Sequence, residues 1–135
     1  MAINKSSVSA DTWTAVNNAL KSLFSGENIY ARFPEDTSKM KKSDFPIVVQ
    51  KPAEVSTAEK LFGRVQSPKD VVVLIEIYSN NPADIDSRSD TIRNYFETTN
   101  VDGIGSPVVN ESDVGELIIN NWVVSFKILA LSFVN

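Results

Sequence analysis

The sequence predicts a small α+β domain, in which a mixed, mainly antiparallel β-sheet carries two helices on one face and long loops join the elements. Two stretches, 9–25 and 82–98, have the apolar spacing of helices. Two others, 70–79 and 122–134, are apolar on both sides, as expected of strands inside a sheet. At 135 residues, the chain fits one domain spanning 1–135.

The first expected element is a helix over residues 9–25. Ser9 or Asp11 is expected to cap its start, and Gly26 is expected to end it in the left-handed conformation. One stripe of this helix is apolar and consists of Trp13, Val16, Leu20, Leu23 and Phe24.

Shorter elements are expected to follow the first helix. Residues 28–33 predict a strand with Ile29, Ala31 and Phe33 on one face, and Pro34 is expected to end it. After a polar loop over 35–43, residues 47–50 predict a second strand, which Pro52 is expected to stop. Residues 53–69 fit either a short strand or a protruding loop or hairpin.

The second half of the chain begins with the long strand at 70–79. Asn81 is a good N-cap for the next helix, Pro82 suits its first position, and Asp84 favours its positive end. Residues 100–113 are rich in Gly, Pro and Asn and predict a loop. Two strands, 116–120 and 122–134, are expected on either side of Asn120 and Asn121.

Composition excludes several classes of function. The chain has no cysteine and no histidine, so thiol chemistry, zinc–thiolate sites and a Ser-His-Asp triad are impossible. The net charge of -4 argues against a protein that wraps nucleic acid. The longest apolar run, 122–134, is shorter than a membrane span and contains Lys127, and the start of the chain has no signal-peptide pattern. We therefore expect a protein made in a cytoplasm that has no membrane partner.

Two clusters in the sequence are candidate chemical sites. Asp84, Asp86 and Asp90, with Glu76 nearby, offer oxygen ligands for a divalent cation, but acidic residues are also typical of a helix start and a solvated face. Their spacing matches no calcium-binding loop, so we prefer the interpretation that they stabilise the helix start and form a solvated face. The glycine pair around Ile104 lacks the flanking strand and helix of a phosphate loop. We expect no catalytic, cofactor or metal residue.

Surface contacts are the remaining candidates. Lys39, Lys41 and Lys42 form the only basic cluster, which suits either an acidic partner or DNA, or a loop kept soluble by charge. Trp122 starts a strand and is expected to be more accessible to a partner than Trp13. The last strand, apolar on both faces, is expected to be central or to pack against another subunit.

The order of these elements resembles a known family. A helix over 11–25 leads to a strand that ends Ala-Arg-Phe-Pro at 31–34, and Asp-Phe-Pro at 44–46 opens the strand 47–50. The long strand 71–78, a helix, an acidic loop and a terminal strand follow. This order is similar to that of the tail terminator proteins of long-tailed bacteriophages, also described as tail-to-head joining or minor tail proteins. The resemblance covers nearly the whole chain except 53–69.

The resemblance implies a non-enzymatic structural virion protein. Such proteins form a homo-oligomeric ring, a hexamer, that caps the tail tube, ends its polymerisation and joins the tail to the head–neck connector. Genomic DNA passes through the lumen without sequence-specific binding. The protein would reside in the virion tail or neck after assembly in the host cytoplasm. The candidate interface residues are Lys39, Lys41, Lys42, Trp122, Phe126 and Phe133.

Two alternatives stay open at this point. The first is a baseplate or adaptor component of a contractile injection system, which has the same physical requirements and a different partner. The second is a metal-dependent enzyme with a carboxylate-only site at Asp84, Asp86 and Asp90.

Overall fold

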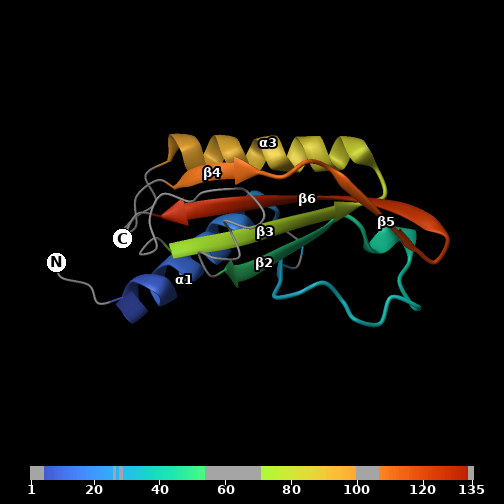
Figure 1. Ribbon diagram of the computed structural model, residues 1–135, viewed down its shortest axis with the longest axis horizontal. Coiled ribbons are helices and arrows are strands. Elements are labelled where there is room, and N and C mark those ends of the chain that lie inside the picture. Colours follow the sequence, from blue (N-terminus) through green and yellow to red (C-terminus); the bar gives the residue numbers. More distant parts are fainter. Residues whose placement is uncertain (1–4, 26, 28, 54–70, 100–106, 134–135) are drawn as a thin grey trace.

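The structure is a computed structural model that describes residues 5–25, 27, 29–53, 71–99 and 107–133 (Figure 1). Within them, six strands form one mixed sheet with two α-helices. The elements are α1 Lys5–Leu23, β1 Ile29–Tyr30, the 3-10 helix η1 Lys42–Asp44, β2 Ile47–Ala53, β3 Val71–Ser79, α3 Pro82–Thr98, β4 Val108–Glu111, β5 Gly115–Ile119 and β6 Trp122–Phe133. The predicted α+β class is confirmed.

Strand pairing makes β6 a central strand. The order across the sheet is β1-β2-β3-β6-β4, and β5 also pairs with β6. Only the β1–β2 pair is parallel, while the other pairs are antiparallel. One edge of β6 pairs with β3 along residues 125–133, and β4 and β5 pair with residues 129–132 and 122–126 of β6. The apolar character of β6 on both faces follows from this central place.

Both helices cover the same face of the sheet, as predicted. Val16 and Leu20 of α1 and Ile85 and Ile92 of α3 have no exposed surface and belong to one apolar cluster. The sheet contributes alternate residues to this cluster, because side chains two apart share a face. The sheet residues are Val48, Val73, Ile75, Ile77, Leu129, Leu131 and Phe133.

A second apolar cluster lies on the opposite face, at the end of the sheet near the β5–β6 hairpin. Phe45, Ile47, Val49, Ile119 and Val124 are its buried members. The connection between β1 and β2 covers this end of the sheet, and its side chains Phe33 and Met40 pack against the cluster. This connection is therefore held by a core of its own instead of lying free in solvent.

The helix α3 was predicted with its observed bounds. The Asn81 side chain accepts a 3.1 Å hydrogen bond from the backbone N–H of Ala83, which satisfies a donor at the helix start. Pro82 stands in the first turn, where its missing N–H costs no hydrogen bond. The buried residues Ile85, Ser89, Ile92 and Phe96 recur at helical spacing.

The ends of the first elements were predicted incorrectly. The helix α1 begins at Lys5, so Ser9 and Asp11 lie inside it and are not its caps. Such residues cost an interior helical position less than about 1 kcal/mol relative to Ala, so they do not fix a helix start. The strand β1 is only two residues long. Ile29 packs on the helix side and Phe33 on the opposite side, so they do not share a face. Gly26 lies outside the described residues.

Two further predictions were wrong because they neglected the sheet edges. Pro52 lies inside β2, paired with Val73, and does not stop it. Proline is tolerated there because β1 pairs only with Val48 and Val49, which leaves β2 at an edge of the described sheet. Residues 108–111 form β4 instead of a loop, because this short strand pairs with the outer edge of β6. Residues 54–70 and 100–106, including the glycine pair, lie outside the described residues.

The predicted turn between the last two strands is confirmed. Asn120 and Asn121 join β5 to β6 and have φ angles of 49° and 69°. Two positive φ angles in a two-residue hairpin loop are typical of a type I′ turn, and asparagine tolerates them better than most residues. The two asparagines thus set the register in which Ile119 faces Trp122.

Candidate interaction surface

The tip of the β5–β6 hairpin exposes an apolar pair. Ile118 and Val123 are register partners, with 74% and 52% of their surfaces exposed. The pairing of β3 with β6 reaches only to Ser125, so the hairpin extends past β3 and past the start of α3 (Figure 1). The helix-side face of the hairpin is therefore bare at Ile118 and Val123, although both are good strand formers whose side chains favour burial.

The other face of the hairpin is packed and tied down. Trp122 meets Phe45 edge to face, with ring centroids 5.9 Å apart. The Asn120 side-chain amide donates hydrogen bonds to the carbonyls of Thr37 and Met40, at 2.7 and 3.2 Å. These contacts hold the connection between β1 and β2 against the hairpin turn.

This connection carries the three lysines singled out in the sequence. Lys39, Lys41 and Lys42 are exposed, and none forms an ion pair within the described part of the chain. The backbone around them is fixed, because the Lys41 N–H donates to Asp44 Oδ2 at 2.7 Å and the Lys42 carbonyl accepts from the Asn80 amide at 3.2 Å. The three lysines thus carry positive charges without an ion pair in the described structure, on a backbone that hydrogen bonds hold in place.

A hollow of about 510 Å³ lies between Lys42 and the hairpin tip. Its walls combine one cation, two amides and two apolar side chains: Lys42, Asn80, Asn121, Trp122 and Val123. Such a mixture suits a protein segment with apolar and acidic side chains. We call this hollow, together with Lys39 and Lys41 that precede Lys42 in the chain, the basic hollow.

The other candidate interface residues lie in different settings. Phe126 is half-buried, with its ring 5.8 Å from that of Tyr78. Phe133 is only 2% exposed and packs in the helix-side core. The structure therefore places Lys42 and Trp122 together in one hollow, leaves Phe126 on the opposite face of the sheet from Val123, and puts Phe133 out of reach of any partner that contacts this surface.

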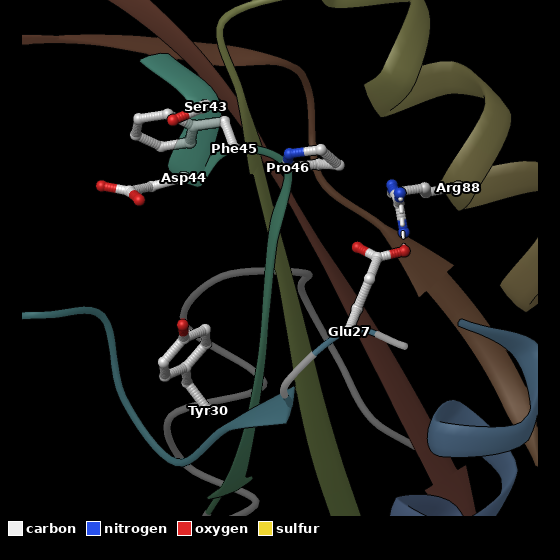
Figure 2. A pocket seen from close by; sticks show the side chains of 7 residues that line it. All are labelled: Glu27, Tyr30, Ser43, Asp44, Phe45, Pro46 and Arg88. Atoms are coloured by element: carbon white, nitrogen blue, oxygen red, sulfur yellow. Dashed lines mark ion pairs between the residues drawn. The ribbon is translucent and has the colours of Figure 1, made fainter. Parts of the chain in front are cut away.

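A second hollow, of about 290 Å³, lies between α3 and the β1 edge of the sheet (Figure 2). An ion pair forms one wall, with Arg88 Nη2 2.9 Å from a Glu27 oxygen, and the Arg88 guanidinium also sits 4.7 Å from the centroid of the Phe24 ring. The lining residues are Glu27, Tyr30, Ser43, Asp44, Phe45, Pro46 and Arg88. Glu27 already neutralises Arg88, so Asp44 is the charged lining residue of this hollow that has no ion pair within the described structure.

The carboxylates weighed as a metal site do not come together. Glu76 is buried on the face opposite the helices, where Lys51 Nζ lies 2.9 Å from one of its oxygens and the Tyr78 hydroxyl donates to the other at 2.8 Å. Asp84 instead accepts a 2.9 Å hydrogen bond from Ser79 at the start of α3. Across the described residues, no group of three or more acidic side chains is placed to hold a metal ion.

An acidic segment lies at the outer edge of β6, where β4 gives way to β5. The Ser112 N–H donates to the Ile128 carbonyl at 2.8 Å, and the Ser112 hydroxyl accepts from the Ile128 N–H at 3.0 Å. The Ser112 side chain thus continues the hydrogen bonding between the β4 edge and β6. Residues 113 and 114, which follow, belong to neither β4 nor β5. Asp113 and Glu116 are exposed and form no ion pair in the described structure, and Val114 is 49% exposed. We call residues 113–116 the acidic edge segment.

Comparison with known proteins gives no relative: no protein-family model matches the chain, and neither does any curated protein. Neither described helix is long and apolar enough to cross a membrane.

The accessible apolar residues of this surface were not predicted from the sequence. The sequence predicts Ile118 and Val123 as ordinary strand residues and Asp113 as the end of a loop, and it assigns Val114 to no element. The available signal was the difference in length between the expected strands 122–134 and 70–79, because a strand that is longer than its neighbour continues past it. That signal does not say which part of the long strand is left uncovered.

Proposed function

We propose that this chain is a non-enzymatic structural virion protein that forms a ring on the end of a phage tail tube. In this role it ends tube polymerisation and joins the tail to the head–neck connector. The resemblance in element order supports the proposal, and so does the α+β fold with both helices on one sheet face.

The observation that carries the assembly part of the proposal is the bare apolar pair Ile118 and Val123. These two β-branched side chains lie opposite each other at the hairpin tip, beside a hollow and three lysines that form no ion pair within the described structure. Together they form a surface that a partner would bury. Fully burying a side chain of this size contributes about 1.5–3 kcal/mol. A ring repeats this contribution at every subunit contact, so a modest surface supports a stable assembly.

The test uses the purified full chain, alone and with the tail tube protein of the same virus, imaged by negative staining and sized by sedimentation. The proposal predicts ring-shaped particles and a cap on tube ends. The variant Ile118→Thr with Val123→Thr keeps β-branched side chains and is expected to weaken assembly by roughly tenfold or more, since 1.4 kcal/mol is a factor of ten.

The matched control is Val108→Thr on β4, which makes the same change at a residue that is 39% exposed and lies away from the hairpin. This control should assemble like the wild type. A wild-type chain that stays monomeric at high concentration and does not bind tube ends would contradict the proposed function.

A further inference from the structure

We infer that the acidic edge segment of one copy docks in the basic hollow of the next copy; this contact rests on the proposed ring assembly and names its two surfaces. The hollow presents Lys42 with Trp122 and Val123, and Lys41 lies next to Lys42 in the chain. The edge segment presents one exposed apolar side chain, Val114, with a carboxylate on either side of it in sequence.

Charge identifies the edge segment as the matching surface. The outer face of α3 also carries acidic side chains, but Arg93 lies 4.0 Å from Asp90 and 3.9 Å from Glu97, which partly neutralises both. Asp86 on this helix is exposed and has no ion pair within the described structure, but it is a single carboxylate, whereas the edge segment has two. Glu111 of β4 pairs with Lys127 at 2.9 Å and also with Arg93. Asp113 and Glu116 have no such partner among the described residues and keep their full charge for a second molecule.

Shape and backbone order support the same match. A volume of about 510 Å³ has ample room for the Val114 side chain, and the hollow has apolar walls at Trp122 and Val123. The Asn80 and Asn120 hydrogen bonds hold the lysine backbone, and the Ser112 bonds hold the start of the edge segment. Little ordering is therefore needed when the two surfaces meet, which favours affinity.

The two surfaces are different parts of one molecule, and in the proposed ring their contact is heterologous and repeats from copy to copy. Such contacts close into a ring or extend into a filament, depending on the rotation between neighbours. A symmetric dimer would instead exchange the two surfaces reciprocally, and the mass of the particle distinguishes a dimer from a ring. The contact therefore gives a head-to-tail order to the proposed ring.

Charge exchange tests the contact in the full-length chain. Lys41→Glu with Lys42→Glu, and separately Asp113→Lys with Glu116→Lys, are each expected to weaken self-association by roughly tenfold or more, as sedimentation measures it. Combining the four changes restores opposite charges and should bring association back to within about threefold of the wild type. Added salt should weaken the wild-type contact.

Two controls make charge changes of the same kind, at single residues elsewhere. Lys21→Glu on α1 and Asp86→Lys on α3 alter exposed residues that have no ion pair within the described structure, and both should assemble normally. Unchanged thermal unfolding of every variant checks that the fold persists.

The outcomes separate the contact from the proposed function. A wild type that forms rings, with exchanged variants that neither weaken nor rescue assembly, would overturn this contact and leave the ring proposal standing. A wild type without self-association would overturn the contact too, and binding to tail tube ends would then decide the proposed function separately.

Discussion

Tyr78 donates a 2.8 Å hydrogen bond to a carboxylate oxygen of Glu76, two residues earlier on the same face of β3. Lys51 on the neighbouring strand lies 2.9 Å from the other oxygen, so both oxygens of this buried carboxylate have a partner. Burial, together with the hydrogen bond to Glu76 and its negative charge, raises the pKa of Tyr78 well above its ordinary value.

The raised Tyr78 pKa predicts a loss of stability in alkaline solution. In the unfolded chain tyrosine loses its proton near pH ~10, whereas in the fold it keeps its proton to higher pH. The stabilisation is therefore fully present below pH ~10 and is lost as pH rises toward the folded-state pKa, by at most roughly 1.4 kcal/mol per pH unit.

Tyr78→Phe isolates this effect from the titration of lysines. At neutral pH the variant should be less stable by about 1–2 kcal/mol, because it lacks a hydrogen bond to a charged acceptor. Denaturant unfolding at pH values from 7 to 11 should show that this difference shrinks above about pH 10. A difference that stays constant over that range would contradict the assignment.

Gly115 is predicted to resist substitution because the Phe126 ring lies over it. The two residues are register partners, and a Cβ on Gly115 would lie 2.4 Å from Cζ of that ring. Gly115→Ala should cost about 1–2 kcal/mol, since the half-buried ring must move away from its packing. In a Phe126→Leu background, thermal unfolding should show the same alanine costing only a few tenths of a kcal/mol.

Gln50 links β2 to the first helix from a fully buried position. Its amide nitrogen donates to the Trp13 carbonyl at 3.0 Å, and its oxygen accepts from Asn17 at 2.9 Å. Gln50→Leu keeps the volume but leaves the Asn17 amide without this acceptor, so we expect a cost of about 1–2 kcal/mol in denaturant unfolding. Asn17→Ala should cost at least as much, because it leaves the oxygen of the fully buried Gln50 without this donor. A Gln50→Leu variant as stable as the wild type would show that this link contributes nothing.

The hairpin turn should discriminate between small residues at position 121. Asn121 has a φ of 69°, which glycine adopts without strain and alanine does not. Asn121→Gly should leave stability unchanged or slightly raised, whereas Asn121→Ala should lose about 1–2 kcal/mol. Thermal unfolding of the two variants side by side measures this, and equal midpoints would argue against a type I′ turn.

Local signals in the sequence were sufficient for the elements with strong caps and long apolar runs. Asn81 and Pro82 marked the start of α3, and the apolar run from Val71 marked β3, because capping and burial act on neighbouring residues. Asn120 and Asn121 likewise indicated the β5–β6 hairpin, because the preference for a turn also depends on neighbouring residues.

What the sequence did not reveal depends on partners far along the chain. The strand β4 exists because β6 has an outer edge to pair with, and Pro52 is tolerated because β2 has an open edge beside it. The candidate surface has the same origin. Lys42 and Trp122 were each singled out, but their place in one hollow arises from the tether between Asn120 and Thr37, which are 83 residues apart in the sequence.

The measurement that tests the account most directly is the mass of the wild-type particle in solution, determined by sedimentation together with negative-stain images of the same sample. The account predicts a closed ring of six copies, which Ile118→Thr with Val123→Thr disrupts and Val108→Thr leaves intact. A chain that remains monomeric at high concentration, or a particle that is indifferent to the hairpin substitutions, would contradict it.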